Sequence, residues 1–131
     1  MSPTEKSIRI LVIDDNPILL EGIVLLVSDQ PDMETVGAAL TADVGLALFI
    51  EKRPNITLVD LELPRSIALE LVKQMRTANP QAKILVLASY ELDGPATAAL
   101  AAGATAVIGK DRIPDGLPDL IRNSFRAVGL H

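Results

Sequence analysis

Residues 10–17 read ILVIDDNP, so that four aliphatic residues run directly into two aspartates, an asparagine and a proline. A short aliphatic run of this kind is typical of a strand buried on both faces of a parallel sheet. Asparagine and proline are favoured at the cap and in the first turn of a helix. The segment therefore predicts a strand followed at once by a helix, with Asp14 and Asp15 at the joint.

The same alternation of short aliphatic runs and longer segments of helical period continues along the rest of the chain. It is typical of an α/β fold in which helices cover both faces of a parallel sheet. We expect strands over residues 8–14, 33–39, 56–61, 83–89 and 106–110. We expect helices over residues 17–28, 42–53, 67–78, 94–102 and 115–128. The first, third and fourth runs are almost purely apolar, which predicts that they are the central strands.

The composition limits the classes of function. A chain of 131 residues has the usual size of one domain. Its net charge of -5 argues against a nucleic-acid interface, which is usually rich in basic residues. The absence of cysteine excludes disulfides and thiolate metal sites and agrees with a reducing compartment. Because no apolar run is long enough for a signal peptide or a membrane span, we expect a soluble, cytoplasmic protein with no membrane partner.

Charged residues stand where three of the predicted strands end. The first strand ends in Asp14 and Asp15, the third in Asp60 with Glu62 shortly after it, and the fifth in Lys110. Ligands of open parallel sheets bind at the carboxyl ends of the strands, so these side chains are expected to meet at one edge. Neighbouring carboxylates stay ionised only beside a cation, and Mg2+ prefers such oxygen ligands.

This edge has the components of phosphoryl chemistry. A carboxylate beside a metal ion can act as a nucleophile toward phosphorus, and a lysine supplies a compensating positive charge. Each residue alone has a simpler interpretation: the aspartate pair could cap the following helix, and Lys110 could be an exposed lysine at a strand end. The hypothesis depends on all of them arriving at the same edge.

Three strings resemble the receiver domains of two-component response regulators: ILVIDDNP at 10–17, LVDLELP at 58–64 and AGATAVIGK at 102–110. The similarity extends over residues 8–128. Lys110-Asp111 without a following proline, and the Glu21-Gly22 pair, look most like the subclass with a LuxR-type helix-turn-helix output domain. We therefore expect residues 1–131 to be one receiver domain, with a core over 8–128 and no second domain in the chain.

The resemblance implies a flavodoxin-like, doubly wound (βα)5 sandwich with strand order 2-1-3-4-5. It makes Asp60 the phosphoacceptor, Asp15 a direct Mg2+ ligand and Asp14 a ligand through water or an orienting group. The main-chain carbonyl of Glu62 would be a third ligand, and Lys110 would contact the phosphoryl group. The implied partner is a histidine kinase, and a homodimer through a helical face that includes the last helix is a further expectation.

Two switch positions depart from the family pattern. The hydroxyl residue that receivers carry 22 residues before the lysine is Ala88 here, and the switch aromatic three residues before it is Val107. Strand alternation is expected to turn the neighbouring Ser89 to the opposite face. A glycine usual eight residues after the phosphoacceptor is replaced by Ala68.

These departures leave three functional interpretations. The first is a phosphoacceptor receiver, a signalling domain that is not an enzyme beyond slow Mg2+-dependent self-phosphorylation and autodephosphorylation, and that serves transcription regulation. The second is a pseudo-receiver, an interaction module that signals without phosphorylation, which Ala88 and Val107 favour. The third is a flavin-binding electron carrier, which DDNP at 14–17 and the single tyrosine, Tyr90, disfavour.

Overall fold

The computed structural model of the protein describes residues 7–89 and 94–127, apart from the side chains of residues 65 and 66. Residue 128, the expected end of the last helix, and Tyr90 lie outside the described residues. The elements are β1 (Ile8–Ile13), α1 (Pro17–Ser28), β2 (Met33–Ala39), α2 (Ala42–Lys52), β3 (Ile56–Asp60), α3 (Arg65–Ala78), β4 (Lys83–Ala88), α4 (Gly94–Ala102), β5 (Ala106–Gly109), a 3-10 turn (Lys110–Arg112) and α5 (Ile113–Arg126). Over these residues, none of the helices has the length and apolar character that crossing a membrane requires.

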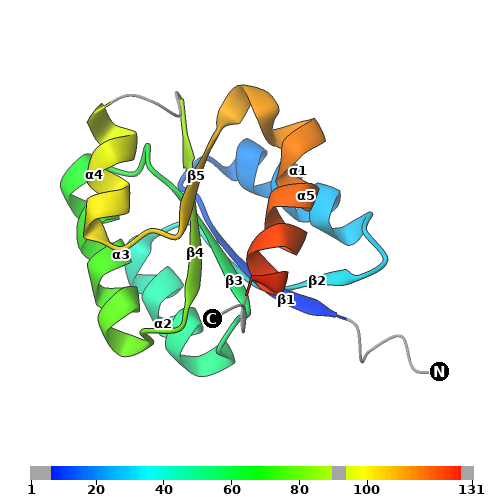
Figure 1. Ribbon diagram of the computed structural model, residues 1–131, viewed down its shortest axis with the longest axis horizontal. Helices are drawn as coiled ribbons and strands as arrows, with labels where there is room; N and C mark the ends of the chain where they lie inside the picture. Colours follow the sequence, from blue (N-terminus) through cyan, green and yellow to red (C-terminus); the bar gives the residue numbers. More distant parts are fainter. Residues whose placement is uncertain (1–6, 90–93, 128–131) are drawn as a thin grey trace.

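The described strands form a parallel sheet in the order β2-β1-β3-β4-β5 (Figure 1). This order confirms the predicted flavodoxin-like topology. The central strands β1, β3 and β4 are almost completely buried, as their aliphatic sequences predict. Short β-branched and leucine runs adopt this position because both of their faces lie against helices.

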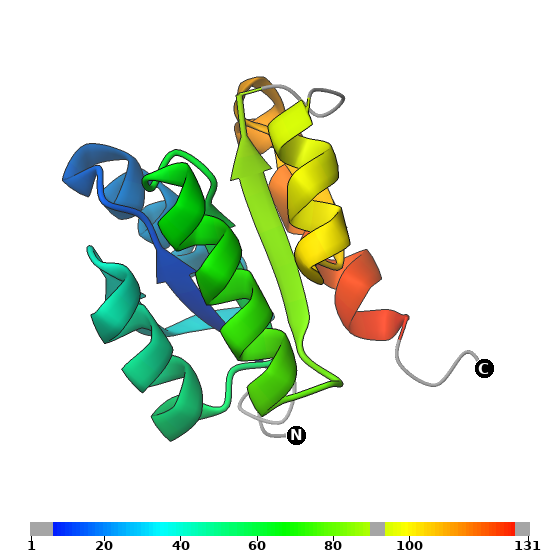
Figure 2. The same ribbon diagram turned by 90° about the vertical axis from the view of Figure 1, so that its left-hand side faces the viewer.

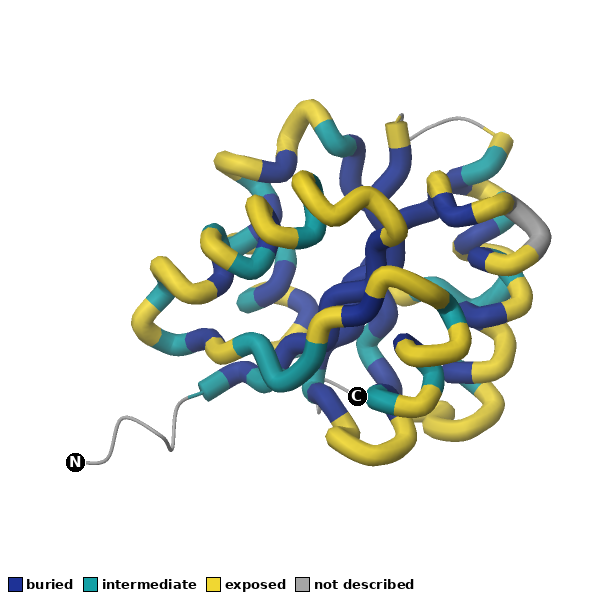
Figure 3. Tube along the Cα trace, turned by 180° about the vertical axis from the view of Figure 1, so that it is seen from behind, coloured by how far each residue is buried: buried dark blue, intermediate teal, exposed yellow. Residues whose placement is uncertain are grey.

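Helices cover both faces of the sheet (Figures 1 and 2). Successive residues of a strand pack in opposite layers. On β1, Leu11 and Ile13 pack in the cluster with α2, α3 and α4. Ile10 and Val12 pack in the other cluster, with α1 and α5. Figure 3 shows the buried sheet between helices whose outer faces are exposed. Because the five strands of the described residues are parallel, their carboxyl termini lie at the same edge of the sheet.

The predicted element bounds need small corrections. Four strands end one residue earlier than expected, because the residue at each expected end already belongs to a loop or turn. Helix α3 begins at Arg65 rather than at residue 67, directly after Pro64. Helix α5 begins at Ile113 rather than at residue 115, with Pro114 in its first turn, where a missing N–H costs nothing.

The apolar side chains of α5 do not all face the core. Leu117 and Ile121 are fully buried, but Phe125 is 37% exposed. Ser124 is buried in its place, because positions 117, 121 and 124 follow the helical period more closely than 125 does. The core stripe therefore ends in a small polar residue, and the phenylalanine ring lies at the surface.

Edge strand β2 contains a bulge. Thr35 pairs with Ile10 and Gly37 with Leu11, so Val36 is an extra residue on the β2 side. A bulge of this kind bends the strand and increases its local twist.

Helix α5 is also tied to the α1–β2 loop by Arg122. Its Nε and one terminal nitrogen donate to the two oxygens of Asp32 at 2.8 and 2.9 Å, and the same terminal nitrogen donates to Gln30 at 2.6 Å. This hydrogen bonding from Arg122 holds the pKa of Asp32 below its ordinary value. The contact links two segments that are 90 residues apart in the sequence.

Two helical glycines have opposite surroundings. A Cβ built on Gly45 in α2 would lie 2.6 Å from Cδ1 and 2.9 Å from Cγ1 of Ile13 on β1. A Cβ built on Gly22 in α1 would meet no atom within 4 Å. Gly45 therefore allows α2 to approach β1 just before the strand reaches Asp14, whereas Gly22 has no such packing role.

We predict that Gly45→Ala destabilises the protein and that Gly22→Ala stabilises it. Alanine is better than glycine in a helix by about 1 kcal/mol, so Gly22→Ala should raise the free energy of unfolding by about that amount. At Gly45 the clash with Ile13 should exceed this gain, since overpacking a core costs about 1–3 kcal/mol. Urea unfolding of both variants checks this, and an equal stabilisation by the two substitutions would contradict the packing argument.

Candidate functional site

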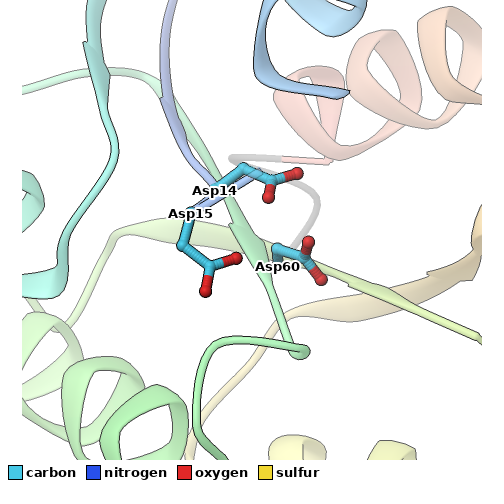
Figure 4. A group of neighbouring side chains, drawn as sticks. All are labelled: Asp14, Asp15 and Asp60. Carbon is cyan, nitrogen blue, oxygen red and sulfur yellow. The ribbon is translucent and has the colours of Figure 1, made fainter. Parts of the chain in front are cut away.

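The ends of β1 and β3 bring three carboxylates together. Asp14 and Asp15 follow the last residue of β1, and Asp60 is the last residue of its neighbour β3. One oxygen of each carboxylate lies within 4.8 Å of the others (Figure 4). The structure thus brings together the acidic residues that the sequence placed at this edge, at a spacing that could hold a metal ion.

Main-chain N–H groups fix two of these side chains. The amide of Asn16 donates to Oδ1 of Asp14 at 2.9 Å, and the amide of Glu62 donates to Oδ1 of Asp60 at 2.9 Å. Capping of α1 is carried out by Asn16, whose side-chain oxygen accepts from Ile18 at 3.0 Å. The aspartate pair is therefore not needed as the helix cap, which removes the simpler interpretation of its position.

Asp14 lies in an environment that disfavours its charge. It is fully buried, and its Oδ2 has no hydrogen-bond partner among the described residues. Burial, with a further contribution from the neighbouring carboxylate of Asp60, raises the pKa of Asp14 to about 7. A buried carboxylate with an unpartnered oxygen, close to two other carboxylates, belongs to a donor set of the kind that a hard divalent cation prefers.

Lys110 supplies the positive charge at the site. It follows β5 in the 3-10 turn, and its Nζ lies 2.9 Å from Oδ1 and 3.0 Å from Oδ2 of Asp60. Partial burial lowers the pKa of Lys110, but hydrogen bonds to Glu62 and Asp60 outweigh this effect and raise it above its ordinary value. The ammonium is therefore charged at neutral pH and held against a carboxylate that is only 1% exposed.

The sequence analysis missed the roles of two side chains at this edge. The Nζ of Lys110 also lies 2.9 Å from Oε1 of Glu62, a residue of which only the main-chain carbonyl was predicted to act. The hydroxyl of Ser89 donates to Oε2 of the same carboxylate. The hydrogen bond from Ser89, followed by the contact with Lys110, holds the pKa of Glu62 below its ordinary value.

The expectation that Ser89 faces away from this network was wrong. Strand β4 ends at Ala88, so strand alternation does not extend to the following residue. The sequence held no signal for this contact, because Glu62 and Ser89 both lie beyond the ends of their strands, where the alternation of side chains no longer applies.

The two switch positions are apolar residues of β4 and β5 that pack in the core beside the carboxyl edge of the sheet. Ala88 is 2% exposed and belongs to the cluster that includes α3 and α4, and Val107 packs partly buried against that cluster. Ala88 pairs with Gly109, the residue before Lys110. Ala68 is fully buried inside α3 and needs no glycine conformation. The site therefore has its charged groups in place but no hydroxyl at position 88.

Comparison with known proteins places this geometry in a family. A family model of the response regulator receiver domain matches residues 10–122. The uncharacterized transcriptional regulatory protein YxjL of Bacillus subtilis is 31% identical over 126 residues, which cover 96% of this chain and 58% of that protein. The nitrate/nitrite response regulator NarL of Escherichia coli is 32% identical, over 86% of this chain and 52% of its own length.

Solved structures give the same result. A LuxR-family two-component response regulator from Aurantimonas sp. SI85-9A1 matches with a TM-score of 0.84 and 29% identity, over 91% of this chain and 85% of that one. The response regulator domain of Thermotoga maritima CheB matches with a TM-score of 0.80 and 25% identity, over 92% and 97% of the two chains.

The chain spans a little more than half of the two curated relatives, at 58% and 52% of their lengths. The strand order, the acidic cluster opposite Lys110 and these similarities have one common explanation: the chain belongs to the response regulator receiver domain family of two-component systems.

Proposed function

We propose that the protein is a phosphoacceptor receiver in which Asp60 takes a phosphoryl group from a histidine kinase. The observation that supports this most directly is the placement of the Asp60 carboxylate. It is 1% exposed, lies 2.9 Å from the ammonium of Lys110 and belongs to one cluster with Asp14 and Asp15. A nucleophilic carboxylate between a cation site and a lysine matches the requirements of phosphoryl transfer.

The acidic cluster fits a Mg2+ ion. We assign Asp14, Asp15, Asp60 and the main-chain carbonyl of Glu62 as the groups that would hold it. The buried and unpartnered Oδ2 of Asp14 supports this assignment, since a cation would give that oxygen a partner. When bound, Mg2+ neutralises the negative charge that carboxylate and phosphoryl oxygens would otherwise accumulate at this edge.

Three residues of the chain have separate roles in the reaction. An oxygen of Asp60 attacks phosphorus, and the bond from phosphorus to the donor breaks with its electron pair leaving on the donor. The amide of Glu62 orients the nucleophile through its contact with Oδ1. Lys110 stabilises the negative charge on the phosphoryl oxygens, which is the electrostatic part of the catalysis.

Several further properties belong to the same proposal. We infer that residues 1–131 act as one receiver domain, that the protein works in the cytoplasm and that it participates in transcription regulation. We propose no direct contact of this domain with nucleic acid, given its net charge of -5. A homodimer through a helical face that includes α5 is proposed as well.

We predict that Asp15→Asn weakens Mg2+ binding by at least about tenfold. Mutation of a residue that only supports a metal ligand typically lowers metal affinity by about 10–100-fold, and loss of a direct ligand should matter no less. Isothermal calorimetry of both proteins measures this. Glu34→Gln is the matched control, because it removes one exposed carboxylate from the opposite end of the sheet. Equal affinities of Asp15→Asn and wild type would remove the metal-site assignment.

We also predict that acetyl phosphate with Mg2+ adds one phosphoryl group, and that Asp60→Asn abolishes the addition. Asp60 alone among the carboxylates of the described residues combines near-complete burial with a direct contact to Lys110. Intact mass spectrometry measures the product. Persistence of the mass increase in Asp60→Asn would identify a different nucleophile, and no increase in the wild type would favour an interaction module that is not phosphorylated.

The coupling of this modification to the rest of the domain is expected to be weak. A ligand shifts a two-state equilibrium only through contacts that differ between the states. A hydroxyl at position 88 would contribute about 1.5–3 kcal/mol through a hydrogen bond to a charged oxygen. Ala88 cannot make this bond, which corresponds to a loss of about ten- to a hundredfold in the population ratio. Val107 has no ring that could follow such a movement.

We therefore predict that a beryllofluoride mimic of the phosphoryl group leaves dimer content and remote amide resonances of the wild type almost unchanged. The double variant Ala88→Thr with Val107→Tyr should regain part of the response. Ultracentrifugation and amide NMR spectra, recorded with and without the mimic, measure both effects. A large remote change in the wild type would show that this receiver switches by another route.

A further inference from the structure

The ammonium group of Lys110 contacts two carboxylates. The Nζ of Lys110 lies 2.9 Å from Oδ1 of Asp60 and 2.9 Å from Oε1 of Glu62. The two carboxylates differ greatly in exposure, at 1% for Asp60 and 56% for Glu62. Lys110 itself is 21% exposed. The ammonium thus forms a bridge from the buried nucleophile to a carboxylate at the surface.

Glu62 is fixed at both of its ends. Its main-chain amide donates to Oδ1 of Asp60, so the backbone is tied to the nucleophile. Its carboxylate is tied to Lys110 through one oxygen and to the hydroxyl of Ser89 through the other. An exposed glutamate usually samples many rotamers, and holding one costs side-chain entropy. The two partners at the carboxylate provide the interactions that favour this single orientation.

We propose that Glu62, positioned by Ser89, competes with the phosphoryl group for the ammonium of Lys110 and thereby slows phosphorylation of Asp60. The inference rests on the proposed function, in which Lys110 stabilises the phosphoryl oxygens. An incoming phosphoryl group must attract an ammonium that already has a carboxylate partner. The Glu62 carboxylate also repels the negative charge of the phosphodonor from the same side.

Ser89 is a positioning residue in this arrangement. Its hydroxyl contacts the Oε2 of Glu62, and no contact between its hydroxyl and Asp60 or Lys110 accompanies that bond among the described residues. Removing the hydroxyl should release the glutamate to other rotamers without removing its charge. The effect of Ser89 on the reaction should therefore pass entirely through Glu62.

The first test compares initial rates of phosphorylation by acetyl phosphate at saturating Mg2+, followed by intact mass. Glu62→Gln keeps the shape of the side chain and removes its charge, and its rate should rise about fivefold, which corresponds to the interaction of two unit charges about 4 Å apart in water. The increase should shrink when the ionic strength is raised to about 1 M, because Glu62 is exposed and its field is screened. Glu34→Gln, with the same change of net charge, should match the wild type.

The second test separates positioning from direct action. Ser89→Ala should raise the rate by about twofold, less than Glu62→Gln does, because the charge remains but is held less firmly. When Ser89→Ala is added to Glu62→Gln, the phosphorylation rate should not change further. If Ser89 acts only through the charge of Glu62, it has no influence once that charge is removed. Thermal midpoints and Mg2+ affinities should stay near those of the wild type, because the proposed metal ligand at position 62 is the main-chain carbonyl.

Three results would overturn the inference. Equal rates for wild type and Glu62→Gln would show that the glutamate does not compete for Lys110. A slower reaction in Glu62→Gln would make this carboxylate an assisting group. A slower reaction in Ser89→Ala would mean that the hydroxyl serves the phosphoryl group directly, in place of the one missing at position 88. Absence of labelling in the wild type and in every variant would reject the proposed function itself, and the inference with it.

Discussion

The contact between Lys110 and the buried carboxylate of Asp60 is the interaction on which the carboxyl edge of the sheet depends. A carboxylate that is 1% exposed needs a partner, because burial of an unpaired polar or charged group is strongly unfavourable. The two residues are 50 positions apart, and they meet only when β5 has joined β4 beside β3. The sheet order and the charge pairing therefore support each other. Asp14 shows the opposite case, because its buried Oδ2 has no partner among the described residues and its pKa is raised to about 7.

Much of the fold could be predicted because the sequence alternates short aliphatic runs with longer segments of helical period. The aliphatic runs of β1, β3 and β4 and the Asn16-Pro17 start of α1 gave strands and a helix close to those observed. Ends of elements were less predictable, since a helix can begin directly after a proline, as α3 does after Pro64, or include it in the first turn, as α5 does with Pro114. The exposure of Phe125 escaped prediction for a related reason, because an amphipathic pattern indicates a stripe but not which residue at its border is buried.

The part of the site that lies at the strand ends could be predicted, because ligands of open parallel sheets bind at the carboxyl ends of the strands. That rule brought Asp14, Asp15, Asp60 and Lys110 to one edge, and the structure places them there. It says nothing about side chains in the loops that follow the strands, where alternation no longer applies. The carboxylate of Glu62 and the hydroxyl of Ser89 are such cases, and their contact depends on the path of two loops that the sequence does not specify. The residues at the strand ends thus predict which charged groups lie at this edge of the sheet. Which of these groups contact one another can be seen only in the structure.

The bulge at Val36 has a consequence for the behaviour of the chain at high concentration. Open parallel sheets expose unpaired main-chain groups along their outer strands, and a flat, aliphatic outer strand is a template for aggregation. In this sheet the most aliphatic strands are enclosed, and the outer positions are occupied by a four-residue strand, β5, and by the bulged β2 with the exposed side chain of Glu34. A second chain that paired with this sheet would have only four residues to pair with on β5, and on β2 it would meet a bulged strand with a charged side chain. The irregularity of β2 therefore protects an unusually aliphatic sheet from pairing with its own copies.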